Sequence, residues 1–127
     1  MQKKLKIFIV DDHEIFRNSL RMIVNRIFPG CEIDEAVNGK DFLQKIKEDA
    51  DLIYMDIRMP EMDGITATKL ALEKYPTLKI LGISMYSDYE IIKSFENAGA
   101  KGFIVKGGNI EEIRLASEKI LNGEDYF

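Results

Sequence analysis

The chain has 127 residues, of which 46% are hydrophobic and 31% are charged, a balance typical of one folded domain and not of a disordered segment. Its net charge of −4 and its lack of a large Lys/Arg cluster argue against binding of nucleic acid through this domain. No apolar run reaches the length of a membrane helix, so no membrane contact is expected. The single cysteine, Cys31, can form no internal disulfide, which fits a cytoplasmic location, and we expect it to be a small buried apolar residue.

Apolar, β-branched runs alternate with segments of helical period along the chain. In chain order, this pattern predicts a strand over residues 5–10, a helix over 16–27, a strand over 31–37, a helix over 39–46, a strand over 52–55, a helix over 64–75, a strand over 78–84, a helix over 87–99, a strand over 102–105 and a helix over 109–123. Ser87-x-x-Glu90 has the form of a capping box, and Asn109-x-x-Glu112 is expected to start the last helix.

Five strands that alternate with five helices predict an α/β fold with a parallel sheet covered on both faces. Right-handed crossovers then favour a doubly wound (βα)5 sandwich with the strand order 2-1-3-4-5. Residues 1–127 are expected to form one domain, because neither a linker nor a repeat interrupts the pattern.

Five polar side chains lie where the predicted strands end, which is the edge at which parallel sheets bind ligands. Asp11 and Asp12 follow the first strand, Asp56 the third and Lys106 the fifth, and Ser84 ends the fourth. Three carboxylates in one crevice repel one another unless a cation lies between them. Oxygen ligands with room for water favour Mg²⁺, with Mn²⁺ as an alternative. Each aspartate taken alone could instead be a helix cap, and Asp12 stands in the position for one.

These motifs together resemble the receiver domain of two-component response regulators. The resemblance covers essentially the whole chain and rests on Val10-Asp11-Asp12-His13, Met55-Asp56-Ile57-Arg58-Met59-Pro60, Asp63-Gly64, Ser84 and Lys106. It implies a signalling switch that accepts a phosphoryl group from a sensor histidine kinase.

The resemblance also assigns a role to each residue. Asp56 is the expected phosphoacceptor, and the expected ligands of Mg²⁺ are Asp11, Asp12, Asp56 and the backbone carbonyl of Arg58. Ser84 and Lys106 are expected to contact the phosphoryl oxygens. Ser84 and the aromatic Phe103 are expected to move as the switch, although Phe103 could instead be a plain core residue.

His13, Met85 and residues 123–127 most resemble the NarL/FixJ (LuxR-type) subfamily. Its members usually continue into a helix-turn-helix domain that binds DNA and regulates transcription, and no such domain is expected within this chain. Met85 stands where many receiver domains have a small residue, and its bulk predicts slow hydrolysis of the phosphoryl group. The apolar residues Ile91, Ile92 and Phe95 fit either a homodimer interface formed on phosphorylation or an ordinary core face.

Two other functions fit parts of the pattern. A Mg²⁺-dependent phosphatase of the haloacid-dehalogenase type would also use an aspartate nucleophile, but it needs a second acid two residues later, where this chain has Arg58. An interaction module that is never phosphorylated would usually lack one of the acids or the lysine. We therefore expect phosphorylation of the chain itself and slow autodephosphorylation, without turnover of an external substrate.

Overall fold

In the computed structural model, which describes residues 4–127, five strands form one parallel sheet. The strands are β1 (Lys6–Val10), β2 (Glu32–Ala36), β3 (Leu52–Asp56), β4 (Ile80–Ser84) and β5 (Gly102–Val105). They lie in the order β2-β1-β3-β4-β5, and each neighbouring pair is parallel. The predicted strand order is confirmed.

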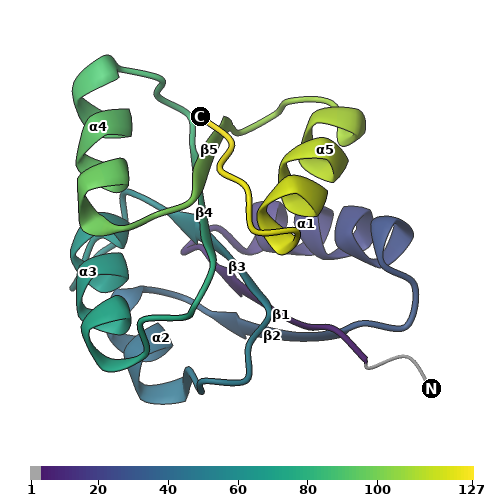
Figure 1. The fold of residues 1–127 in the computed structure, drawn as a ribbon, viewed down its shortest axis with the longest axis horizontal. Coiled ribbons are helices and arrows are strands. Elements are labelled where there is room, and N and C mark those ends of the chain that lie inside the picture. The colour runs from purple at the N-terminus through teal and green to yellow at the C-terminus, as the bar shows by residue number, and fades with distance from the viewer. Residues whose placement is uncertain (1–3) are drawn as a thin grey trace.

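Five helices cover the two faces of this sheet. They are α1 (Glu14–Ile27), α2 (Gly39–Lys45), α3 (Gly64–Lys74), α4 (Tyr89–Ala98) and α5 (Ile110–Leu121). Helices α1 and α5 lie on one face, and α2, α3 and α4 lie on the other (Figure 1). The structure is therefore the predicted doubly wound sandwich. Within residues 4–127, none of the helices is both long enough and apolar enough to cross a membrane.

Burial along the strands agrees with their places in the sheet. The central strands β3 and β4 are buried at every position and are almost wholly apolar, as expected for parallel strands covered on both faces. The edge strand β2 exposes Glu32 and Asp34, whose charges hinder pairing with another sheet. At the other edge, Tyr126 donates its backbone N–H to Lys101 at 2.9 Å and accepts that of Phe103 at 2.8 Å. The chain after α5 thus lies along β5 (Figure 1).

Each face of the sheet has its own apolar core. The core beneath α2, α3 and α4 includes Phe42 and Phe95, and the core beneath α1 and α5 includes Leu20. Ile91 and Ile92 of α4 are partly buried against the same core as Phe95. The apolar face of α4 is therefore largely a core face.

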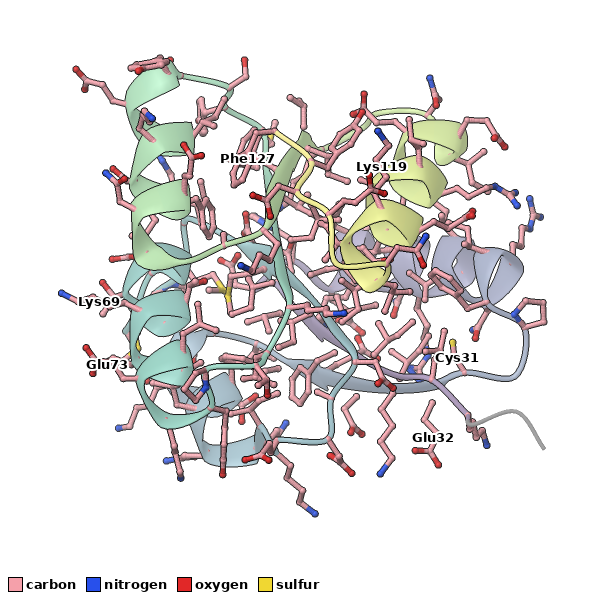
Figure 2. All side chains as sticks on the ribbon, viewed as in Figure 1. Cys31, Glu32, Lys69, Glu73, Lys119 and Phe127 are labelled. Carbon is pink, nitrogen blue, oxygen red and sulfur yellow. The ribbon has the colours of Figure 1, made fainter. Side chains whose placement is uncertain are left out.

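The outward face of α3 carries charged side chains. On α3, Ala67 and Ala71 are buried, whereas Lys69 and Glu73 are exposed and point away from the sheet (Figure 2). Cys31 is only partly buried, not fully buried as predicted, because it precedes the edge strand β2. Even partial burial raises the pKa of its thiol.

One of the two predicted helix starts is confirmed. The side chain of Asn109 accepts the backbone N–H of Glu112 at 2.9 Å and caps α5. The capping box predicted at Ser87 is wrong, since Asp88 has the extended backbone of a capping residue and its carbonyl accepts the first hydrogen bond of α4. The third helical residue is then Ile91, which has no side-chain acceptor to complete a capping box.

Candidate functional site

The carboxyl ends of the strands bring the predicted polar residues to one edge of the sheet. Asp11 follows β1, and Asp56 is the last residue of the adjacent strand β3. Ser84 is the last residue of β4, and Lys106 follows β5. Ligand atoms of three aspartates and one histidine lie within 4.8 Å of one another: Asp11, Asp12, His13 and Asp56.

Lys106 joins two of these carboxylates. Its Nζ lies 2.8 Å from Oδ2 of Asp11 and 3.3 Å from Oδ2 of Asp56, and its side chain is only 9% exposed. The same Nζ lies 4.5 Å from the centre of the Phe16 ring. The sequence contains no sign of this last contact, because Phe16 there belongs only to the apolar face of a helix.

Asp56 is buried, and its charge is only partly compensated. Its Oδ1 accepts the backbone N–H of Ile57 at 2.9 Å, and its Oδ2 faces Lys106. Burial first, and the negative charge of Asp11 second, raise the pKa of Asp56 from 3.8 to about 6, while Lys106 acts in the opposite direction. The site therefore holds more negative charge than Lys106 neutralises.

His13 and the two adjacent aspartates form the second part of the site. Oδ1 of Asp11 accepts the backbone N–H of His13 at 2.8 Å, and Nδ1 of His13 lies 3.3 Å from one oxygen each of Asp11 and Asp12. His13 is the N-cap residue of α1. Asp12 is not the N-cap, because the extended residue that precedes α1 is His13. The assignment of Asp12 as a possible cap is wrong, and its carboxylate is left for the site.

The donors present fit a hard divalent cation. Oδ1 of Asp12 is buried and makes no hydrogen bond within the part of the chain that the structure describes, although Nδ1 of His13 lies near it. A buried carboxylate oxygen without a partner is unfavourable, and coordination of a cation would satisfy it. Together with Asp11 and Asp56 it makes a set of oxygen donors of the kind that Mg²⁺ prefers.

The Asp63-Gly64 pair has a structural role at the start of α3. The side chain of Asp63 accepts the backbone N–H of Thr66 at 2.8 Å and caps the helix. The N–H of Gly64 donates to the carbonyl of Ile57 at 2.7 Å, and a Cβ added to Gly64 would lie 1.9 Å from the carbonyl oxygen of Asp56. Only glycine lets α3 approach the end of β3 this closely.

Ser84 and Phe103 lie in the interior beside the site. Ser84 is 2% exposed, and its Oγ accepts the backbone N–H of Tyr86 at 3.1 Å. The ring of Tyr86 stacks under the guanidinium of Arg58 at 4.4 Å, which links the loops after β3 and β4. Phe103 is buried with its ring centre 6.3 Å from that of Phe95. Phe103 is thus a core aromatic in this state, and its switching role and the ligand role of the Arg58 carbonyl remain predictions.

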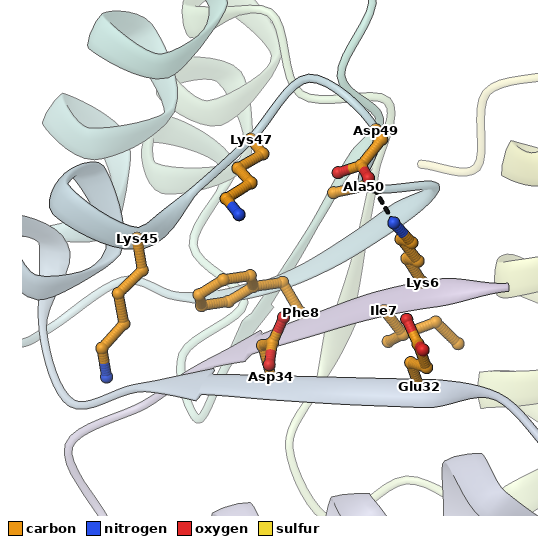
Figure 3. A pocket seen from close by; sticks show the side chains of 9 residues that line it. All are labelled: Lys6, Ile7, Phe8, Glu32, Asp34, Lys45, Lys47, Asp49 and Ala50. Atoms are coloured by element: carbon orange, nitrogen blue, oxygen red, sulfur yellow. Dashed lines mark hydrogen bonds and ion pairs between the residues drawn. The ribbon is translucent and has the colours of Figure 1, made fainter.

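A hollow of about 240 Å³ lies at the opposite, amino-terminal end of β1 (Figure 3). Its lining mixes both signs of charge, from Lys6, Glu32, Asp34, Lys45, Lys47 and Asp49. Lys6 forms an ion pair with Asp49, and Lys45 forms one with Asp41. Because these charges largely compensate each other, the hollow does not have the uncompensated acidity of the site beside Asp56.

Comparison with known proteins identifies the family. The response regulator receiver domain matches residues 7–118, so the chain belongs to this family. The uncharacterized transcriptional regulatory protein YhcZ of Bacillus subtilis is 37% identical over 123 residues, covering 96% of this chain and 56% of YhcZ. The chain therefore spans about half the length of that relative.

Two solved structures support the same assignment. A two-component response regulator of the LuxR family from Aurantimonas has a TM-score of 0.87 and 27% identity, covering 98% of this chain and 90% of that one. The CheX–CheY–BeF3–Mg²⁺ complex from Borrelia burgdorferi has a TM-score of 0.76 and 30% identity. The match covers 90% of this chain and 88% of that one. The predicted resemblance to LuxR-type receiver domains is confirmed. Receiver domains are signalling switches and not turnover enzymes, so the phosphatase alternative is not supported.

Proposed function

We propose that this chain is a phosphorylation switch in which Asp56 accepts a phosphoryl group from a sensor histidine kinase. The observation that carries the proposal is the pairing of a buried, poorly neutralised carboxylate with Lys106, beside two further aspartates. A carboxylate becomes a useful nucleophile toward an anionic donor only when positive charge offsets the repulsion between them.

The transfer requires ionised Asp56. A carboxylate oxygen of Asp56 forms a bond to phosphorus as the bond from phosphorus to the imidazole nitrogen of the donor breaks, and the electron pair of that bond stays with the imidazole. Lys106 lies within reach of Oδ2 of Asp56 and can then pair with the new phosphoryl oxygens. Ser84 ends the neighbouring strand, and its hydroxyl can donate to one of these oxygens.

The proposed metal is Mg²⁺, with Mn²⁺ able to substitute. Asp11, Asp12, Asp56 and the backbone carbonyl of Arg58 would hold it. The buried Oδ1 of Asp12, which makes no hydrogen bond within residues 4–127, supports this assignment. When bound, the cation would neutralise negative charge on Asp56 and on the transferred phosphoryl group. The related Borrelia burgdorferi complex contains Mg²⁺ and BeF3, a mimic of a phosphoryl group, which supports a common site.

The proposed output is a change on the face formed by α4, β5 and α5. A phosphoryl group would draw Ser84 inward, and Phe103 would turn into the space that Ser84 leaves. The proposed output is regulation of transcription in the cytoplasm, because the relative YhcZ is named a transcriptional regulatory protein. Only 56% of YhcZ is matched by this chain, and the proposed output domain is a helix-turn-helix domain outside the matched part. A phosphorylation-dependent homodimer is a further part of this proposal.

Intact mass spectrometry tests the phosphorylation directly. The chain is incubated with acetyl phosphate and Mg²⁺, with a parallel sample in excess chelator and with the Asp56→Asn variant. The proposal requires one added phosphoryl group that depends on the metal and is absent from the variant. Equal labelling of Asp56→Asn, or turnover of many acetyl phosphate molecules per chain, would contradict it.

A further inference from the structure

Arg17 on α1 reaches back to the backbone of the acidic site. Its Nη1 donates to the carbonyl oxygen of Asp11 at 2.8 Å, and its Nε donates to Oε1 of Glu35 on β2 at 3.1 Å. The Arg17 side chain is only 14% exposed. Oε2 of Glu35 accepts from Arg21, one turn further along α1, at 3.1 Å. The guanidinium of Arg17 is thus held between a strand carboxylate and the first residue of the site.

The hydrogen bond from Arg17 leaves neither backbone polar group of Asp11 without a partner. The N–H of Asp11 donates to the carbonyl of Ala36 on β2 at 3.1 Å, so both backbone polar groups of Asp11 have partners. The carbonyl of Asp11 belongs to the planar peptide group that also contains the nitrogen and the Cα of Asp12. Whatever holds that carbonyl therefore sets the orientation of one acidic residue relative to the next.

We propose that Arg17, oriented by Glu35, is a positioning residue that fixes the relative placement of Asp11 and Asp12 for Mg²⁺. This inference rests on the proposed metal-dependent function. A positive charge this close to a cation site would by itself oppose binding of the cation, and Glu35 neutralises that charge. The benefit of Arg17 must therefore come from geometry and not from its charge.

A substitution that keeps the charge separates the two effects, because charge alone predicts an unchanged affinity for Mg²⁺ and geometry predicts a weaker one. Arg17→Lys keeps the positive charge but loses the planar fork that donates to a carbonyl and a carboxylate at once. Loss of such a supporting contact is expected to weaken binding of Mg²⁺ about 10-fold. Arg21→Lys is the matched control, because Arg21 also pairs with Glu35. Its second contact is with the carbonyl of Ile33 on β2, whereas the second contact of Arg17 is with the carbonyl of Asp11. The affinity of Arg21→Lys for Mg²⁺ should stay close to that of the wild type.

The experiment is a titration with Mg²⁺ alone, followed through the backbone amide NMR signals of residues 11–13 and 56. Urea unfolding of each variant tests whether the fold is retained. Glu35→Gln is a second variant, which is also expected to weaken binding of Mg²⁺. Failure of the wild type to bind Mg²⁺ would sink the proposed function itself. Wild-type binding with an unchanged affinity in Arg17→Lys, or equal weakening in Arg17→Lys and Arg21→Lys, would overturn only the positioning role.

Discussion

Replacing the buried Asp56 carboxylate should make the unphosphorylated protein more stable at neutral pH. Burial and the nearby charge of Asp11 raise the pKa of Asp56 from 3.8 to about 6, so ionised Asp56 is less favourable in the folded protein than in the unfolded chain. A rise of this size corresponds to about 3 kcal/mol of folding stability. Asp56→Asn removes the charge and keeps the shape, so it should recover a large part of this free energy.

The pH dependence of the effect has a definite sign. Below pH 3.8, the carboxyl group of Asp56 is protonated in both the folded and the unfolded state and costs nothing. Between 3.8 and about 6, the unfolded chain loses the proton before the folded protein does, so wild-type stability falls as the pH rises. Above about pH 6, Asp56 is ionised in both the folded and the unfolded state, and the loss of folding stability has its full size.

Urea unfolding across this pH range, without divalent cations, measures the difference between the wild type and Asp56→Asn. The two proteins should be nearly equally stable at the acidic end and should diverge toward neutral pH, with the variant the more stable. Asp34→Asn, which removes an exposed carboxylate from β2, should change stability by less than about 0.5 kcal/mol. A wild type as stable as Asp56→Asn at neutral pH, or a difference that does not vary with pH, would show that ionised Asp56 does not destabilise the folded protein.

Three further predictions follow from particular contacts. Gly64→Ala would place a Cβ 1.9 Å from the carbonyl oxygen of Asp56, so urea unfolding should show a loss of about 3 kcal/mol or more, and wild-type stability would contradict the close approach. Tyr54→Phe leaves the buried hydroxyl of Ser117 without its 2.6 Å partner and should cost about 1–3 kcal/mol, part of which returns in the double variant with Ser117→Ala. Met85→Ala should shorten the lifetime of the phosphorylated protein, followed by the decay of the added mass, and an unchanged lifetime would show that this 69% exposed side chain shields nothing.

The fold could be predicted from the sequence because its signals are local and repeated. Each apolar strand run is followed by a segment of helical period, and handedness then leaves few arrangements of five such units. Because parallel sheets bind ligands at the carboxyl ends of their strands, the positions of Asp11, Asp56 and Lys106 in the chain suffice to predict that they share one edge. The precise helix starts were less predictable, as Ser87 shows, since the capping residue depends on where the preceding loop leaves the sheet.

Contacts between distant side chains could not be predicted in the same way. The packing of Lys106 against Phe16 and the reach of Arg17 to the carbonyl of Asp11 depend on how α1 lies across the sheet, which the helical period does not specify. The buried oxygen of Asp12 is likewise visible only after folding, because a sequence shows which groups are acidic but not which of them make no hydrogen bond in the described part of the fold.

Asp56, and not its acidic neighbours, is the proposed carrier of the phosphoryl group. Borohydride reduces an aspartyl phosphate to homoserine, so the chain can be phosphorylated with acetyl phosphate and Mg²⁺, reduced, digested and sequenced by mass spectrometry. Homoserine should be found at position 56 alone and should disappear when the metal is chelated. Homoserine at position 11 or 12, or its absence from a protein that has gained phosphoryl mass, would contradict the assignment of Asp56.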